Sequence, residues 1–307
     1  MKIAIIQLEK TLKSSVYAIE ELFYINNNFC KQKDEIEIYT KILKLNDLEN
    51  SKLFDMIIIP PLMSGDSFDY DIPKLNKWLI NQHENNAILC SACVGSFFLA
   101  NTKLLDNKKA TTHWAYSDYF KEKFPNVILN TDKILVDEKK FITAGGVTAY
   151  MDLCLYIIEK YHSNKTASAL ANLLVIDKTR ESQKSYKSFS TIFLFDDDEI
   201  KKCANLIKEN LKEQYSNKIL ANYLNLNERT FTRRFKKALN TTPNKYMQNL
   251  RIEKAKELLI TTNKSFDSIT FEVGFYNESS FRKLFKRETS LNPSEFRKRY
   301  KQTIKNS

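Results

Sequence analysis

Two segments in the last third of the chain follow the same plan, and this repetition limits the possible folds more than any other feature. In each segment a short apolar helix is predicted before a tight turn, and a longer amphipathic helix after it. Phe231 and Phe235, within 228–239, recur as Phe281 and Phe285 with the same i, i+4 spacing, so each pair lies on one helix face. The repeat predicts two helix-turn-helix units in an all-α region.

The residues at the turns support this interpretation. Asn227 and Asn277 stand where the longer helix of each unit begins, and asparagine is a preferred N-cap. Gly274 is expected to form the second turn in a left-handed conformation. Between the units, residues 251–260 predict a helix with one apolar side, and such a helix would connect the two units rigidly.

The positive charge of the chain is concentrated in this region. Residues 201–307 hold 24 Lys and Arg against 10 Asp and Glu, a net charge of +14, whereas the first 200 residues carry a net charge of −3. This asymmetry predicts a polyanionic partner for one part of the chain only, and release of counterions from DNA would drive the binding. With its aromatic pair inward, the helix 228–239 would expose Arg229, Thr232, Arg233 and Lys236.

The first half of the chain alternates apolar strands with helices. Short aliphatic runs typical of buried parallel strands occur at 2–7, 35–39, 56–60 and 87–90. Helices are expected at 15–27, 73–85, 95–105 and 150–161, and a hairpin at 133–143. This order predicts a doubly wound, flavodoxin-like α/β domain.

A segment without helical periodicity separates the two halves. Residues 178–198 are rich in Ser and Lys, and we assign them as a linker between domains at 1–177 and 199–307. The linker ends in the acidic run 196–198, directly before a helix expected near Glu199. Negative charge is favourable at a helix N-terminus. The pattern leaves open whether the run is a solvated surface or has a regulatory role.

The composition excludes several classes of protein. The apolar stretch at the N-terminus is too short for a signal peptide and no run approaches a membrane span, so a cytoplasmic location is expected. The five cysteines are scattered and are expected to be reduced thiols. His83, His113 and His162 are too widely spaced to form a metal site, and no cofactor is expected.

Residues 87–100 (AILCSACVGSFFLA) predict a strand that turns sharply into a helix, with Cys93 on the turn. The small residues Ala92 and Gly95 would let the backbone turn tightly, as in a nucleophile elbow. A helix N-terminus stabilises a thiolate, which makes Cys93 a candidate nucleophile. Cys90 and Cys93 also form a C-x-x-C pair that suits a redox site, although the position of Cys90 within the strand favours Cys93 alone facing a pocket.

The C-terminal region resembles the DNA-binding domain of the AraC/XylS family of transcription regulators. The resemblance rests on the segments LANYLNLNERTFTRRFKK, RIEKAKELL, ITFEVGFYNESSFRKLFK and NPSEFRKRY. Thr270 and Lys283 depart from it, at positions where Ala and Arg are usual. The resemblance implies binding of double-stranded DNA, and Arg233 would bridge O6 and N7 of a guanine. The residues implied to contact bases are Arg229, Thr232, Arg233, Ser279, Ser280, Arg282 and Lys283.

The N-terminal half resembles the DJ-1/PfpI group of the class I glutamine amidotransferase-like superfamily. The elbow at Cys93 carries this resemblance, together with the segments ATTHW and TAGGVT. It implies a ligand pocket formed by Cys93, Val94, His113 and Gly65. Ser15 stands where catalytic members place an acidic residue, and Val94 where protease-like members have His, so the groups that would activate the thiol are incomplete.

Together the two resemblances imply a transcription regulator and not an enzyme. The N-terminal domain would sense a small-molecule effector and pair two subunits as a homodimer, and the effector would shift the DNA-binding domains between two arrangements. The alternative is a DJ-1-like cysteine enzyme, of glyoxalase or amidase type, that its basic domain tethers to DNA. The identity of the effector and the sign of regulation stay open.

Overall fold

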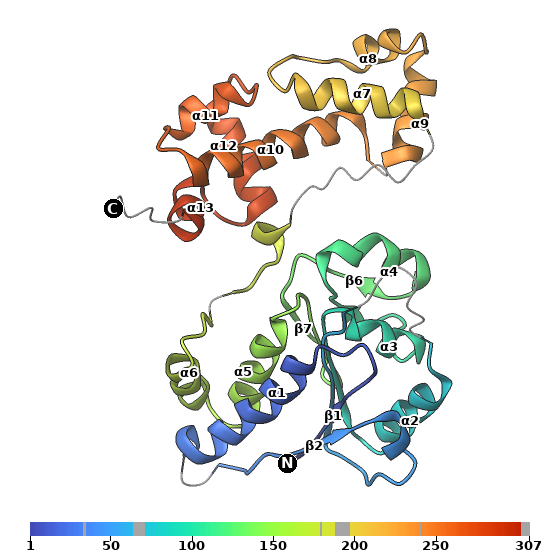
Figure 1. The fold of residues 1–307 in the computed structure, drawn as a ribbon, viewed down its shortest axis with the longest axis vertical. Helices are drawn as coiled ribbons and strands as arrows, with labels where there is room; N and C mark the ends of the chain where they lie inside the picture. Colours follow the sequence, from blue (N-terminus) through green and yellow to red (C-terminus); the bar gives the residue numbers. More distant parts are fainter. Residues whose placement is uncertain (33–34, 64–70, 179, 188–196, 240, 302–307) are drawn as a thin grey trace. The chain divides into compact units, whose positions relative to one another are not determined.

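The computed structural model describes residues 1–32, 35–63, 71–178, 180–187, 197–239 and 241–301. The chain forms two compact units, Met1–Gln183 and Lys184–Ser307, each with its own hydrophobic core (Figure 1). The division between the units falls inside the predicted linker 178–198, of which residues 188–196 lie outside the described part of the chain. Every helix in the described part is too short or too polar to cross a lipid bilayer.

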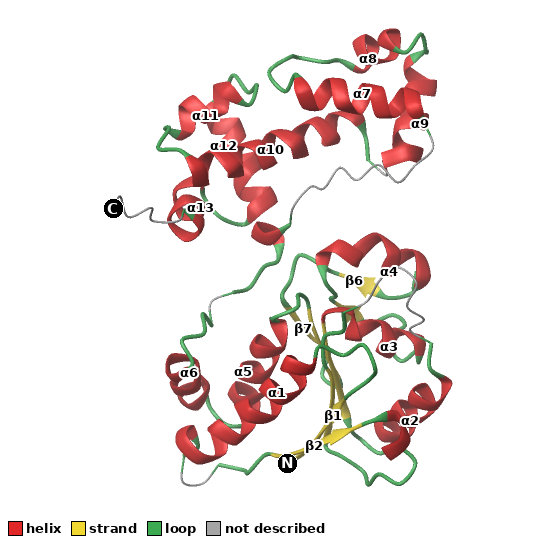
Figure 2. Ribbon diagram, viewed as in Figure 1, coloured by secondary structure: helices red, strands yellow, loops and turns green. Residues whose placement is uncertain are grey.

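A six-stranded sheet forms the centre of the N-terminal unit (Figure 2). Its strands lie in the order β2-β1-β3-β4-β8-β7, and only β7 runs antiparallel to its neighbour. The strands are β1 Lys2–Ile6, β2 Tyr39–Leu43, β3 Met56–Ile59, β4 Ile88–Ala92, β7 Leu135–Asp137 and β8 Phe141–Ala144, while β5 Lys109–Ala110 and β6 Ile128–Leu129 form a separate parallel pair.

Helices cover both faces of this sheet, which confirms the predicted doubly wound α/β fold. Along β3 the side chains alternate: Met56 and Ile58 pack in the core beneath α1, α5 and α6, whereas Ile57 and Ile59 pack on the side of α2 and α3 (Figure 1). The helices are α1 Lys13–Ile25, α2 Pro73–Glu84, α3 Ser96–Asn101, α4 Ser117–Lys123, α5 Ala149–Tyr161 and α6 Asn164–Leu173, with the helical turns η1 Asn26–Cys30, η2 Leu45–Asp47, η3 Cys93–Gly95 and η4 Trp114–Tyr116.

The second predicted strand was placed wrongly. The strand β2 spans Tyr39–Leu43 rather than 35–39. Glu35 instead accepts hydrogen bonds from the hydroxyls of Ser163 and Thr166 beside the start of α6. These partners are remote in sequence, so the alternating pattern EIEIY gave no sign of them. The helix predicted at 95–105 is also shorter, because α3 ends at Asn101 and turns follow it.

The described residues of the C-terminal unit form helices joined by turns. The long helix α10, Pro243–Thr261, contributes side chains to both hydrophobic cores of this unit, and the predicted helix 251–260 is its second half. Phe231 and Phe235 lie in one core, and Phe281 and Phe285 in the other, all fully buried as predicted. The elements are η5 Lys184–Tyr186, α7 Asp198–Glu209, α8 Asn217–Tyr223, α9 Glu228–Leu239, α10, α11 Phe266–Glu272, α12 Glu278–Thr289 and α13 Pro293–Tyr300.

Gln183, the last residue of the N-terminal unit, is buried within that unit. Its amide donates to Thr111 Oγ1 and to the carbonyl oxygens of Thr112 and Lys133, and its oxygen accepts from the N–H of Trp114. The side chain fills the space beside Gly145, where an added Cβ would lie 1.9 Å from Nε2 of Gln183. The N-terminal unit therefore continues beyond the boundary predicted at residue 177.

We expect Gln183→Ala to destabilise the N-terminal unit by about 2–4 kcal/mol, because buried backbone groups lose their partners. Trp78 and Trp114 are the only tryptophans, and both belong to this unit, so tryptophan fluorescence reports its unfolding selectively. Urea unfolding of the full chain should give a lower fluorescence midpoint than for Gln32→Ala, a control at an exposed position. Equal midpoints for the two variants would contradict this role of Gln183.

Candidate functional site

Cys93 occupies the sharp turn between β4 and α3. Its φ is +56°, a left-handed conformation that is uncommon for a residue with a side chain. An added Cβ at Gly95 would lie 2.7 Å from the carbonyl oxygen of Ile59, so the adjacent strand leaves space only for glycine. The elbow expected from the sequence is therefore present. Strained backbone of this kind is concentrated at functional positions.

The surroundings of Cys93 keep its thiol neutral. Burial raises the pKa of Cys93 to about 12, and the N–H of Val94 offsets this only in part. In the described part of the chain no charged side chain contributes to the shift. Ser15, at the position where the resemblance implies an acid in catalytic members, donates its hydroxyl to the carbonyl oxygen of Leu12. A thiol with this pKa is a weak nucleophile near neutral pH.

The loop that carries His113 is joined to the elbow by a hydrogen bond. Thr112 Oγ1 donates to the carbonyl oxygen of Cys93 at 3.0 Å. Nδ1 of His113 accepts from the N–H of Ala115 at 3.1 Å, and burial lowers the pKa of His113, which favours the neutral ring. Cys93 and Val94 are buried, at 2% and 1% exposure, and His113 is half-buried. Gly65, the fourth residue expected at this pocket, lies outside the described residues.

The C-x-x-C pair is divided between the two sides of the sheet. Cys90 packs in the core beneath α1 and α5, whereas Cys93 packs in the core on the side of α2 and α3. The thiols are free in the structure. Because a disulfide requires the two Cβ atoms to face each other, this arrangement disfavours a redox pair and leaves Cys93 as the cysteine of the elbow.

The first candidate recognition helix is α9. Asn227 accepts a hydrogen bond from the N–H of Thr230 at 2.8 Å, which confirms its role as an N-cap. Phe231 and Phe235 pack edge to face, with ring centroids 5.5 Å apart, and this contact turns the opposite side of the helix toward solvent. On that side Arg229, Arg233 and Lys236 are exposed and Thr232 is half-buried.

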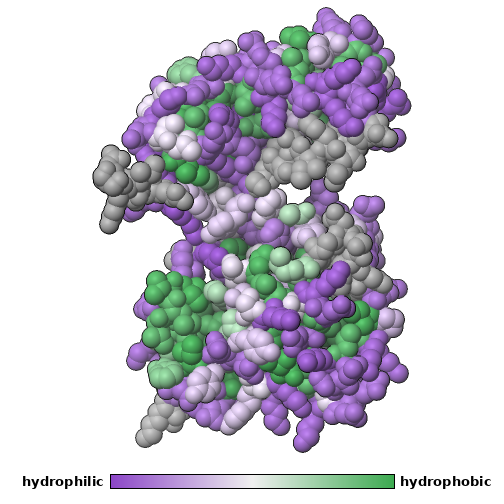
Figure 3. Space-filling view, in the orientation of Figure 1, coloured by the Kyte–Doolittle hydropathy of each residue, from purple (hydrophilic) through white to green (hydrophobic). Residues whose placement is uncertain are grey.

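The second candidate recognition helix, α12, is built in the same way. Asn277 accepts from the N–H of Ser280 at 2.8 Å, and Gly274 has the left-handed conformation expected from the sequence, with φ of +88°. The ring of Phe281 stacks on that of Phe266 in the core, at 5.4 Å between centroids. Four of the residues implied to contact bases are exposed on α12: Ser279, Ser280, Arg282 and Lys283. In the view of Figure 3 the surface of the C-terminal unit is mostly hydrophilic.

Arg234 differs from its neighbour Arg233 and is a residue that sequence reasoning missed. Its guanidinium donates to both carboxylate oxygens of Asp197, at 2.7 and 3.0 Å, and pairs with Glu199. Asp197 is also the N-cap of α7, accepting from the N–H of Ile200. The acidic run therefore has a structural role at Asp197, where it joins α7 to α9. An acidic residue before a helix was a visible signal, but its distant arginine partner was not.

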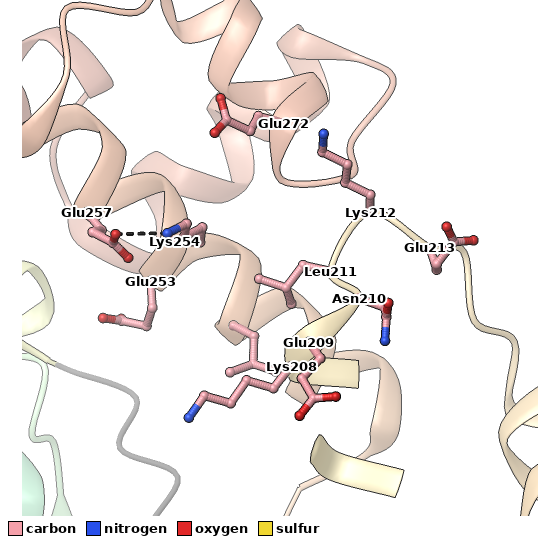
Figure 4. Close-up of a pocket in the computed structure, with 11 residues that line it drawn as sticks. Lys208, Glu209, Asn210, Leu211, Lys212, Glu213, Glu253, Lys254, Glu257 and Glu272 are labelled. Atoms are coloured by element: carbon pink, nitrogen blue, oxygen red, sulfur yellow. Dashed lines mark hydrogen bonds and ion pairs between the residues drawn. The ribbon is translucent and has the colours of Figure 1, made fainter. Parts of the chain in front are cut away.

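A groove of about 980 Å³ lies beside α10 in the same unit (Figure 4). None of the candidate base-contacting residues lines it. Acidic side chains outnumber basic ones around it, and Lys254 is paired with Glu257 at 2.8 Å. This charge does not suit a polyanion, so the candidate nucleic-acid surface remains that of α9 and α12. The charged residues of the groove are Glu209, Glu213, Glu253, Glu257, Glu272, Lys208, Lys212 and Lys254.

We expect Cys93 to resist alkylation near neutral pH. A raised pKa favours the protonated thiol, and at pH 8 a pKa of about 12 leaves only a trace of thiolate. Mass spectrometry after iodoacetamide treatment should find Cys93 modified far more slowly in the folded chain than in the same chain in urea. Comparable rates in the two states would show that the thiol is activated.

Comparison with known proteins places these features in families. Residues 220–299 match a family described as a helix-turn-helix domain, and residues 15–160 match the DJ-1/PfpI family. The transcriptional regulator GbdR of Pseudomonas aeruginosa is 28% identical over 210 residues, which cover 68% of this chain and 57% of GbdR. The match thus spans little more than half the length of that relative.

Two further similarities each cover one part of the chain. The raffinose operon regulator RafR of Pediococcus pentosaceus is 40% identical over 98 residues, 31% of this chain and 35% of RafR. The crystal structure of a putative transcriptional regulator from Vibrio parahaemolyticus superposes with a TM-score of 0.50 at 18% identity, covering 57% of this chain and 98% of that one, and it supports the fold alone. The chain therefore combines an AraC-type helix-turn-helix domain at residues 220–299 with a domain of the DJ-1/PfpI family at residues 15–160.

Proposed function

We propose that this protein regulates transcription by binding a bipartite DNA site through α9 and α12. The observation that carries this proposal is the repeated construction of the two helices. Each is capped by asparagine, buries a pair of phenylalanines and exposes polar and basic side chains. The high positive charge of residues 201–307 supports binding to the DNA phosphates. Such a protein would act where the DNA is, in the cytoplasm.

Specificity would come from a few side chains on the exposed faces. Arg229, Thr232 and Arg233 on α9, with Arg282 and Lys283 on α12, would enter the major groove. Ser279 and Ser280 lie in the first turn of α12. Lys236 and most other exposed cations would contact phosphate, which positions the protein without reading sequence. The helix α10 contributes side chains to the cores of both helix-turn-helix units. We therefore expect the two elements of the DNA site to lie about one helical turn apart.

The N-terminal unit would sense a small molecule at the elbow. The neutral thiol of Cys93, the backbone of Val94 and the neutral ring of His113 are suited to binding by hydrogen bonds and packing. The enzyme alternative is favoured by the elbow geometry, but the raised pKa of Cys93 opposes it. Cys93→Ser distinguishes the two: loss of turnover on glyoxals or amides, with DNA binding intact, would support an enzyme.

The test of the proposal is selection of DNA from a random pool by the full-length protein at near-physiological salt. Two enriched elements about one helical turn apart would support a sequence-specific regulator. Binding without enrichment, fading as salt rises, would leave only nonspecific electrostatic attraction and would overturn the proposal.

Arg233→Ala is expected to weaken binding to the selected site by about 1–3 kcal/mol and to relax preference at one base position. Lys236→Ala should lower affinity uniformly across sequences. The neighbouring Arg234 provides a matched control, because it pairs with Asp197 and Glu199. Arg234→Gln should lower stability and leave the base preference unchanged. A uniform loss for Arg233→Ala, measured over single-base variants of the site, would assign Arg233 to phosphate instead.

We further propose that the protein is a homodimer paired through the N-terminal unit. A hydrophobic patch covers the region of α6 (Figure 3), where Leu173 and Val175 are 58% and 92% exposed. Phe29 of the adjoining turn η1 is 72% exposed. Exposed apolar surface of this kind is typical of subunit interfaces.

The double variant Leu173→Glu, Val175→Glu is expected to sediment as a monomer at concentrations where the parent is a dimer, because it places charge in an apolar interface. Lys77→Glu on α2, which is exposed on the other side of the sheet, is the control and should remain dimeric. An unchanged sedimentation coefficient for the double variant would exclude this surface.

A further inference from the structure

The two helix-turn-helix units are connected at a second place besides α10. The loop 211–214 follows α7 and belongs to the first unit, and it packs against the turn at Gly274 and Phe275 in the second. We call this contact the clasp, formed by residues 211–214, Arg251, Gly274 and Phe275. Leu211 and part of this loop are visible beside α10 in Figure 4.

Arg251 is the centre of the clasp. It lies on α10 between Leu250, which packs in the first core, and Ile252, which packs in the second. Its side chain is buried, at 8% exposure, and donates to the carbonyl oxygens of Leu211 at 3.0 Å and Glu213 at 2.8 Å. A guanidinium with two fixed donors orients a loop in a way that a flexible ammonium does not.

The same guanidinium reaches the second unit. It lies over the ring of Phe275, 5.4 Å from the centroid, and Phe275 stacks on Phe281 of α12 at 4.3 Å. Gln214 Nε2 adds a hydrogen bond of 2.8 Å to the carbonyl oxygen of Gly274. The backbones approach so closely that a Cβ on Gly274 would lie 2.5 Å from the carbonyl oxygen of Leu211. The turn before one recognition helix is thus held directly by the loop of the other unit.

A second attachment changes what a connecting helix can do. A single connecting helix sets the distance between two helix-turn-helix units. Bending and twisting of that helix would still let the units rotate relative to each other. An attachment away from the axis removes that rotation. We infer that the clasp fixes the angle between α9 and α12, so that the protein selects DNA sites by the spacing of their two elements. This inference rests on the proposed function, and it assigns Arg251 and Gln214 as positioning residues that touch no base.

The test is a spacing series built on the selected DNA site, in which the two elements are moved apart or together by one and two base pairs. Arg251→Gln is expected to reduce the preference for the selected spacing about tenfold, because two hydrogen bonds of the clasp are lost. Arg251→Lys should restore little of it. Lys254→Gln removes the same charge from a half-buried position on the same helix, outside the clasp, and should keep the full preference.

Gln214→Ala is the variant least able to disturb folding, since Gln214 is exposed and its hydrogen bonds are to the carbonyl oxygens of Gly274 and Lys212. It should reduce the spacing preference about threefold. Binding to a DNA that carries one element alone should be unchanged for every variant. Spacing profiles identical to that of the parent chain, in variants that keep their fold, would overturn the inference.

A second measurement needs no DNA. In a Cys30→Ser background, spin labels on Lys237→Cys and Lys286→Cys report the distance between α9 and α12 by electron–electron double resonance. We expect one narrow distance distribution for the parent and a broader one after Arg251→Gln. A broad distribution in the parent, or equal widths in both, would contradict the clasp. If selection finds no bipartite site, the proposed function fails while this measurement still decides whether the clasp exists.

Discussion

The burial of two phenylalanine pairs determines what the C-terminal unit presents to its surroundings. Phe231 and Phe235 on α9, and Phe281 and Phe285 on α12, are removed completely from solvent. Each buried aromatic side chain contributes about 2–3 kcal/mol or more, far beyond the value of any single surface charge. Rotation of either helix about its axis would expose these phenylalanines and is therefore unfavourable. The polar and basic residues on the opposite face consequently point toward solvent. Recognition thus depends first on a hydrophobic constraint and only then on charge.

In the N-terminal unit the decisive effect is desolvation. The fold supplies a strained elbow, a glycine that permits it and a helix directly after it, which are the features that enzymes use to activate a nucleophile. The same fold buries the thiol of Cys93 without a charged partner among the described residues, and its pKa rises accordingly. An elbow of the kind that enzymes use for catalysis thus holds, in this chain, a thiol whose raised pKa favours the neutral form.

Local patterns predicted much of this structure, and the exceptions share one cause. The i, i+4 phenylalanines, the asparagine caps and the left-handed Gly274 are properties of short segments, and each was found where expected. The roles of Glu35, Arg234 and Gln183 were not predicted from the sequence, because the partners described above are 35 to 131 residues away. A hydrophobicity pattern identifies a residue as polar, but it does not predict which sequence-distant group that residue will bind.

Gln183 carries a practical lesson about where one folding unit stops. Its side chain fills the space next to Gly145, although Gln183 lies in a segment whose composition is typical of a linker. A fragment that ends at the predicted boundary, residue 177, would lack the Gln183 side chain. The backbone carbonyls that Gln183 binds would then lose their partner. Crystallisation or ligand screening with such an isolated N-terminal fragment would use a protein with an unfilled cavity beside Gly145. A fragment that extends through residue 183 would keep the hydrogen bonds that Gln183 makes in the interior.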